Sequence, residues 1–441
     1  MEEKTRMTNG LLSGTVSRRG LLAGTGGLAV LAALAACSSP GGTATSTLKF
    51  WNMPWGGTAF SPLDKKITLA YKPASGLPAA GYQAVQWSNF TTTFASALAS
   101  NTGPAVSSGA GTQAFQFAEK NYIAYADSLF DSWKSNGMLD DFLPGVLDTM
   151  KTSKGYVAVP YNLDMRVLWY RKSLLEKAGV EAPTDWQSYL DVCAALKKIG
   201  VYGFGIASGA QGNGFQVLTG LLINNGGGLF NADQKPDCVT PANIEALEFV
   251  VEMVRKGYMD PGSVSYSTTN AQSQWKAGTF GMGFESPGLA QVLGGPLVQD
   301  MTVGEPLTGA RGGKGALYFP NNIMMYKHTP SQKGSEDFLT YYYKNMAPLW
   351  TQNTGIGLPV LKSIAATKEF QADRNAVTMI EKWQPICKTW AAPGGDALFA
   401  DVTLVDSTPA MSTWAQSVLS LKATPKESLQ TLQKTLTSQQ K

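Results

Sequence analysis

The pattern of apolar and polar positions after residue 46 predicts short strands that alternate with helices. Residues 47–51 alternate apolar and polar side chains and lead into a loop rich in Pro and Gly, which predicts a first strand with a loop at its carboxyl end. Helices are expected at residues 90–99, 112–120, 172–178, 186–199 and 244–256. Short apolar runs predict strands at residues 156–159, 167–170, 204–207 and 323–326. This alternation predicts an α/β fold, and the length of 441 residues favours two lobes over a single core.

The N-terminal segment has the pattern of an export signal. Arg18 and Arg19 precede an uncharged, mostly apolar run that ends at Cys37 and is too short to span a bilayer comfortably. SRRGLL at residues 17–22 resembles a twin-arginine signal, and LAAC at residues 34–37 resembles a lipobox, whose cysteine is acylated. We therefore expect residues 1–36 to be a removed signal peptide and residues 37–45 to be a lipidated Cys37 with a flexible tether. The alternative is a buried N-terminal helix.

Composition and charge remove several classes of function. The chain has 36 Lys and Arg against 32 Asp and Glu, a formal net charge of +4, which favours neither nucleic acid nor an anionic surface as a partner. The single histidine, His328, is expected in an exposed loop, and no Cys and His grouping has metal-ligand spacing, so no cofactor is expected. Cys193, Cys238 and Cys387 allow at most one disulfide, and Cys193 is predicted to lie in the core.

Several motifs together resemble one protein family. They are GYVAVP at 155–160, VLWYRK at 167–172, LEKAG at 175–179, PTDW at 183–186, QWKAGTFGM at 274–282, the segment 331–342 and GIGLP at 355–359. Their order and spacing are similar to those of the family 1 extracellular solute-binding proteins, and the likeness covers all of the predicted folded part. Two departures lie near the first lobe's face of the expected cleft: Ala105 stands where the family usually has aspartate, and residues 72–83 are unusually rich in Pro, Gly and Ala.

The resemblance implies a periplasmic-binding-protein fold of two α/β lobes that close by a hinge around a cleft. On this basis the first lobe comprises residues 46–161 and 284–345, and the second comprises residues 162–283 and 346–441. The resemblance further implies a lipoprotein on the outer face of the cytoplasmic membrane, not an enzyme. It would act as a monomer that delivers a sugar or oligosaccharide to ABC permease subunits with a cytoplasmic ATPase.

Sugar binding requires planar polar groups and aromatic faces, which the sequence supplies in the loops that the resemblance indicates. The candidate polar ligands are Asn52, Gln113, Asp164, Arg166, Glu285, Asn321 and Asn322, and the candidate aromatic platforms are Trp55, Trp275, Trp350, Trp383 and Trp390. A single tryptophan is more often a core residue than a platform, and Trp55 is the exception because it lies among Pro and Gly. Asp164 and Arg166 could equally form an ordinary surface ion pair.

Three other functions stay open at this point. An exported glycosidase would also need aromatic platforms, together with two carboxylic acids about 5 to 9.5 Å apart. A glycerophosphodiester ligand would need several Arg or Lys side chains, and only Arg166 is suitably placed, which favours a neutral sugar. A structural lipoprotein without a small-molecule ligand is the third alternative.

Overall fold

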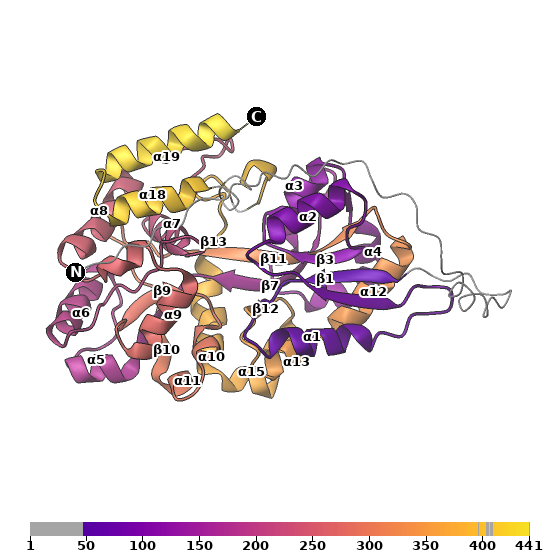
Figure 1. Cartoon of the computed structure of the whole chain (residues 1–441), viewed down its shortest axis with the longest axis horizontal. Coiled ribbons are helices and arrows are strands. Elements are labelled where there is room, and N and C mark those ends of the chain that lie inside the picture. The colour runs from indigo at the N-terminus through magenta and orange to yellow at the C-terminus, as the bar shows by residue number, and fades with distance from the viewer. Residues whose placement is uncertain (1–46, 396, 403–404, 406–408, 441) are drawn as a thin grey trace, which may run out of the picture. The chain divides into compact units, whose positions relative to one another are not determined.

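Figure 1 shows the computed structural model, which describes residues 47–395, 397–402, 405 and 409–440. The predicted signal peptide, Cys37 and the tether at residues 37–45 lie outside the described residues. No helix in the described ranges is long and apolar enough to cross a membrane.

Within the described residues the strands form two main sheets and one small hairpin. The first sheet has the order β12-β7-β11-β3-β1-β2, with β4 and β13 also paired to β11, and the second has the order β10-β8-β9. The strands are β1 (Leu48–Asn52), β2 (Ala80–Ala84), β3 (Val106–Gly109), β4 (Ile123–Ala124), β5 (Lys151–Thr152), β6 (Gly155–Tyr156), β7 (Val159–Met165), β8 (Val167–Arg171), β9 (Met282–Glu285), β10 (Met301–Val303), β11 (Ala316–Tyr326), β12 (Leu358–Pro359) and β13 (Cys387–Lys388).

The helices form two groups along this framework. In Figure 1, α1 to α4 and α12 lie around β1 and β3, whereas α5, α6, α8, α9, α18 and α19 lie toward the other end, and β7 and β11 extend between the groups. The α-helices are α1 (Phe60–Leu69), α2 (Phe90–Ala99), α3 (Gln113–Glu119), α4 (Asp127–Ser135), α5 (Lys172–Ala178), α6 (Trp186–Lys198), α7 (Gly214–Asn224), α8 (Pro241–Arg255), α9 (Thr268–Ala277), α10 (Leu289–Leu293), α11 (Leu297–Asp300), α12 (Gln332–Asn345), α13 (Pro348–Thr351), α14 (Lys362–Ala365), α15 (Lys368–Ala372), α16 (Arg374–Thr378), α18 (Pro409–Leu419) and α19 (Pro425–Gln439).

Local signals explain where the predicted helices begin. The Asp185 side chain accepts a hydrogen bond from the Ser188 backbone N–H at 2.8 Å, and the Ser188 hydroxyl lies 3.1 Å from the Asp185 backbone nitrogen, which makes a capping box for α6. Thr240 caps α8 in a similar way and Pro241 occupies its first turn, so α8 begins before the expected residue 244. The five predicted helices are confirmed, and α2 and α5 have the expected bounds.

The strand predictions were less accurate. The expected strand at 204–207 is wrong, because this segment is a buried loop in which Gly205 makes one isolated bridge to Gly283. Phe204 and Ile206 are both buried there, and a short apolar run looks the same in sequence whether it forms a strand or a buried loop. The expected strand at 156–159 is divided between the end of β6 and the start of β7.

One residue links the two sheets along the chain. β7 ends at Met165 and β8 begins at Val167, so Arg166 lies between a strand of the first sheet and a strand of the second. Its backbone N–H donates to the Leu317 carbonyl of β11 at 3.0 Å, which ties the crossing to the longest strand of the first sheet. The predicted lobe limits stay a prediction. β10, at residues 301–303 of the predicted first lobe, pairs with β8 of the predicted second lobe. β12, at residues 358–359 of the predicted second lobe, pairs with β7.

Each helix group encloses its own aromatic core. The Phe50 ring lies 5.2 Å from the Phe338 ring, which connects β1 to α12. In the other group, Trp186 stacks on Phe249 with ring centroids 4.4 Å apart, which connects α6 to α8. Cys193 is fully buried in this second core, as predicted, and none of the three cysteines in the described part is disulfide-bonded.

Candidate ligand-binding site

The carboxyl end of β1 presents Asn52 and Trp55 in a fixed arrangement. The Asn52 amide nitrogen donates to Asp64 at 2.6 Å, and the Asn52 amide oxygen accepts from the Trp55 indole N–H at 3.0 Å. The same indole nitrogen lies 3.1 Å from the Ser108 hydroxyl of β3, which accepts a second bond from it. The predicted pair therefore lies together, with Asn52 buried and Trp55 partly exposed.

An exposed tryptophan that the sequence analysis missed lies beside Trp55. The Trp87 ring lies 4.8 Å from the Trp55 ring at an interplanar angle of 87°, and its N–H donates to the Pro54 carbonyl at 3.0 Å. Trp87 is 40% exposed, one of the few large apolar side chains in the described residues with so much surface. Its position between polar Gln86 and Ser88, shortly after β2, was the available signal.

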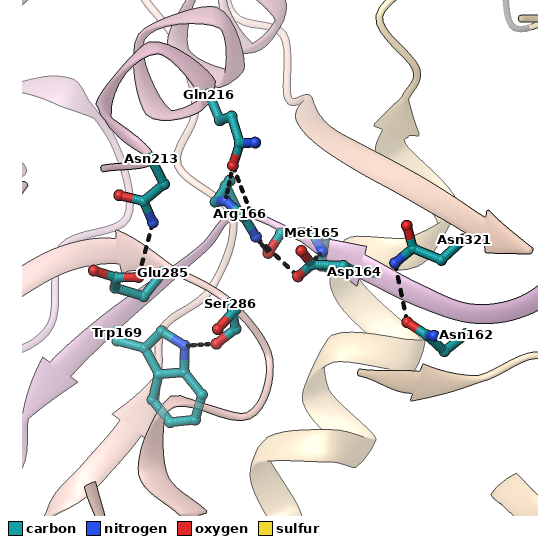
Figure 2. A network of polar contacts seen from close by, with 10 residues as sticks. All are labelled: Asn162, Asp164, Met165, Arg166, Trp169, Asn213, Gln216, Glu285, Ser286 and Asn321. Atoms are coloured by element: carbon teal, nitrogen blue, oxygen red, sulfur yellow. Dashed lines mark hydrogen bonds and ion pairs between the residues drawn. The ribbon is translucent and has the colours of Figure 1, made fainter. Parts of the chain in front are cut away.

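Arg166 is the centre of a buried polar network at the crossing between the sheets (Figure 2). Its Nε and Nη2 atoms donate to the Gln216 side-chain oxygen at 2.9 and 2.5 Å, and Nη1 donates to Asp164 at 2.8 Å and to the Met165 carbonyl at 3.0 Å. The guanidinium carbon also lies 4.9 Å from the centre of the Phe319 ring. The arginine side chain is only 9% exposed, so this is not the exposed surface pair considered as the alternative.

Glu285 lies near this network at the end of β9. Burial raises the pKa of its carboxyl group, and the nearby Arg166 charge and a hydrogen bond from Asn213 oppose that rise. The Asn213 amide nitrogen donates to Glu285 at 2.9 Å, as Figure 2 shows, whereas the Asn213 amide oxygen has no hydrogen-bond partner within the described residues. The adjacent Ser286 carbonyl accepts from the Trp169 indole at 3.0 Å, which holds the end of β9 against β8.

A group of amide side chains comes from β7, β11 and the first residue of α3. Asn321 donates to the side-chain oxygen of Asn162 at 3.0 Å, and Asn322 donates to the Gly111 carbonyl at 3.2 Å. The amide nitrogen of Asn162 and the amide oxygens of Asn322 and Gln113 are buried without a partner among the described residues. Because buried polar atoms are usually hydrogen-bonded, these atoms are suited to a ligand or to water.

The other four candidate tryptophans are all buried, which favours the core interpretation that the sequence left open. Trp350 and Trp383 donate to the backbone carbonyls of Gly357 and Gly304, at 2.7 and 2.9 Å. Trp275 is fully buried against Phe280 in the second helix group. Trp390 is stacked on Phe215 and lies edge-on to Phe319, next to Arg166. Their contact with a ligand stays a prediction.

His328 is exposed, as predicted. In the described part of the chain, no three His, Cys, Asp or Glu side chains gather closely enough to hold a metal ion.

The two α/β lobes joined through β7 have the two-lobed fold of the periplasmic binding proteins. The sequence model of the bacterial extracellular solute-binding proteins matches residues 80–347, and the chain belongs to this family. The family that the sequence motifs indicated is therefore confirmed.

Three known proteins illustrate the likeness. A sugar transporter from Arthrobacter chlorophenolicus A6, solved with bound laminaribiose, is 46% identical, with a TM-score of 0.84 over 90% of this chain and 100% of that chain. Maltose-bound MalE3 of T. maritima is similar in fold, with 17% identity and a TM-score of 0.72 over 88% of this chain and 98% of that chain. The diacetylchitobiose binding protein NgcE of Streptomyces coelicolor is 27% identical over 155 residues, which are 34% of this chain and 33% of that protein.

Proposed function

We propose that this chain is the carbohydrate-binding component of an ABC importer and that it holds a disaccharide or short oligosaccharide between its lobes. The observation that carries the proposal is its 46% identity to a sugar transporter solved with laminaribiose, across the whole of that chain. The side chains near the carboxyl end of β1 support it, because Trp55 and Trp87 offer indole surface for sugar C–H groups. The unpartnered amide atoms of Asn162 and Asn213 suit sugar hydroxyls. Laminaribiose is therefore the first ligand to test.

The state of Arg166 favours a neutral sugar over a phosphodiester. A guanidinium group has five N–H donors. Four are already used, one from Nε, two from Nη1 and one from Nη2. The pairing with Asp164 also neutralises much of the positive charge that a phosphate would need. Arg166 therefore supports the crossing strand more readily than it clamps an anion.

The binding test is titration calorimetry with laminaribiose, other β- and α-linked glucose disaccharides, and a glycerophosphodiester. We expect micromolar or tighter binding of at least one disaccharide and none of the phosphodiester. Binding of the phosphodiester alone would contradict the sugar assignment while leaving the family membership intact. Trp55→Ala tests the platform, and Lys434→Ala, on the distant helix α19, is the control that should bind normally.

Ligand binding should also change the arrangement of the lobes. A ligand favours the closed form only through contacts that are better in that form, so closure and binding are linked. Small-angle scattering of the protein with and without saturating sugar should show a smaller radius of gyration in the complex. An unchanged radius, with binding proven by calorimetry, would contradict hinge closure.

The glycosidase alternative depends on Asp164 and Glu285, the two carboxylic acids beside Arg166. Both side chains already have partners, since Asp164 pairs with Arg166 and Glu285 accepts from Asn213. We expect no hydrolysis of aryl glucosides. A measurable rate that Glu285→Gln abolishes would support an enzyme instead.

We also propose that the protein is exported by the twin-arginine route and is anchored by a diacylated Cys37 to the outer face of the cytoplasmic membrane. In this proposal it acts there as a monomer and delivers sugar to the permease. The support is the motif order SRRGLL, apolar run and LAAC in the first 37 residues. Replacing Arg18 and Arg19 by lysine should block export, and Cys37→Ser should abolish labelling with palmitate. Normal labelling of the Cys37→Ser variant would contradict the anchor.

A further inference from the structure

A buried carboxylate that is not among the predicted binding residues contacts Asn52 at the end of β1. Asp64, in the middle of α1, is fully buried. One of its oxygens accepts from Asn52 at 2.6 Å, and the other accepts from the Tyr342 hydroxyl of α12 at 2.5 Å. No ion pair with Asp64 exists within the described residues, so the charge is held by hydrogen bonds alone, which is a costly arrangement in a protein core.

The carboxylate determines which way the Asn52 amide faces. An amide side chain has a donor side and an acceptor side. Because the donor side binds Asp64, the oxygen must face Trp55, whose N–H it accepts at 3.0 Å. The reversed amide would place an NH₂ group against an indole N–H and an oxygen against a carboxylate, and both contacts would be repulsive. The orientation of Asn52 therefore depends on Asp64.

A second contact route from Asp64 reaches the Trp55 ring itself. Tyr342, which donates to Asp64, lies 2.9 Å from the Tyr161 hydroxyl of β7. The Tyr161 ring in turn lies 6.3 Å from the Trp55 ring, edge to face at 77°. Trp55 is thus held at its N–H by Asn52 and along its ring by Tyr161, and both supports lead back to the same carboxylate.

We infer that Asp64 is a positioning residue for ligand binding, which fixes Trp55 through Asn52 and Tyr161 without touching the ligand itself. This inference rests on the proposed function in one respect, that Trp55 is a sugar platform. The titratable groups facing Asp64 are the three tyrosines Tyr82 of β2, Tyr161 of β7 and Tyr342 of α12.

The main test combines Asp64→Val with Trp55→Phe in full-chain protein, with laminaribiose as the probe. Asp64→Val removes both acceptors, and we expect laminaribiose affinity to fall about tenfold, as for loss of one hydrogen bond to a charged group. In the Trp55→Phe background, which lacks the indole N–H and keeps only the ring contact with Tyr161, the same change should have a clearly smaller effect. Equal losses in both backgrounds would overturn the inference.

Two further variants guard against a simple folding defect. Asn52→Asp alone sets two carboxylates against each other and should weaken binding. Adding Asp64→Asn should restore affinity to within about threefold, because the exchanged pair again joins a donor to an acceptor and still offers Trp55 an oxygen. The matched control is Asp337→Asn, which removes a similar hydrogen-bonded carboxylate, the one that accepts from the Tyr71 hydroxyl at 2.6 Å, in the same helix group. Absence of rescue in the double variant would also overturn the inference.

The Trp55 indole N–H resonance separates this inference from the proposed function. In ¹H–¹⁵N spectra without ligand, Asp64→Val should shift the Trp55 peak and Asp337→Asn should not. A shifted peak in a protein that binds no sugar would refute the proposed function and leave the positioning role intact. An unshifted peak in a protein that does bind laminaribiose would refute the positioning role alone.

Discussion

The burial of Asp64 predicts an unusual dependence of stability on pH. Burial raises the pKa of its carboxyl group from 3.8 to about 6, in spite of the opposing hydrogen bonds from Tyr342 and Asn52. A difference of this size makes the ionised form about 3 kcal/mol less favourable in the folded state than in the unfolded state. Most carboxyl groups in salt bridges behave in the opposite way.

The direction follows from proton binding. Because the pKa is higher in the folded state, the folded state binds more protons between pH 3.8 and about 6. The contribution of Asp64 to the free energy of unfolding is therefore fully present below pH 3.8 and is lost as the pH rises through about 6. Asp64→Asn cannot titrate, so its stability relative to the natural protein should increase by about 2.4 kcal/mol between pH 4 and pH 7.

Urea unfolding of the natural protein and of Asp64→Asn at pH 4, 5, 6 and 7, at constant ionic strength, measures this difference. Asp337→Asn, measured in parallel, reports the effect of removing another hydrogen-bonded carboxyl group from the same helix group. A stability difference that stays constant within about 1 kcal/mol over this pH range would refute the reasoning. It would mean that the hydrogen bonds to Asp64 fully offset the effect of its burial on the pKa.

Three further predictions concern single side chains. Asp185→Ala removes the cap of α6 and should lower the free energy of unfolding by about 1 kcal/mol, measured in urea, and Asp185→Ser should recover most of the loss. Lysine at position 166 cannot bind Gln216 through two nitrogens, so Arg166→Lys should lower the melting temperature and the free energy of unfolding, the latter by about 2 kcal/mol. An unchanged melting temperature would contradict a structural role for Arg166. Trp87→Ala should weaken laminaribiose binding about tenfold in calorimetry with little change in melting temperature, because the ring is 40% exposed.

The sequence predicted the parts of the fold that local signals determine. The start of α6 is encoded within four residues, by Asp185 and Ser188, and the predicted helix is present. The loop at 204–207 could not be distinguished from a strand, because its burial depends on contacts with residues such as Gly283 that are remote in sequence.

For the candidate site, too, the sequence predicted contacts between residues that are close in sequence and missed contacts between distant ones. Asn52 ends β1 and Trp55 follows three positions later in the next loop, and the two side chains do lie in contact. Asp64 was missed because it occupies a helix that also contains Lys65 and Lys66, where an acidic residue normally faces solvent. The partner of Arg166 was missed for a different reason, since Gln216 is 50 positions away in sequence and only the fold brings it close.

The position of β11 in the first sheet has a consequence for how the protein is synthesised. β1 pairs with β3, β3 pairs with β11, and Ser107 contacts Tyr326 across 219 positions of sequence. A nascent chain that has emerged only to residue 300 therefore carries β3 and β7 with exposed edges, ready to pair with other chains. Such distant pairing slows folding, and completion of the first sheet must wait until about three quarters of the chain has left the ribosome.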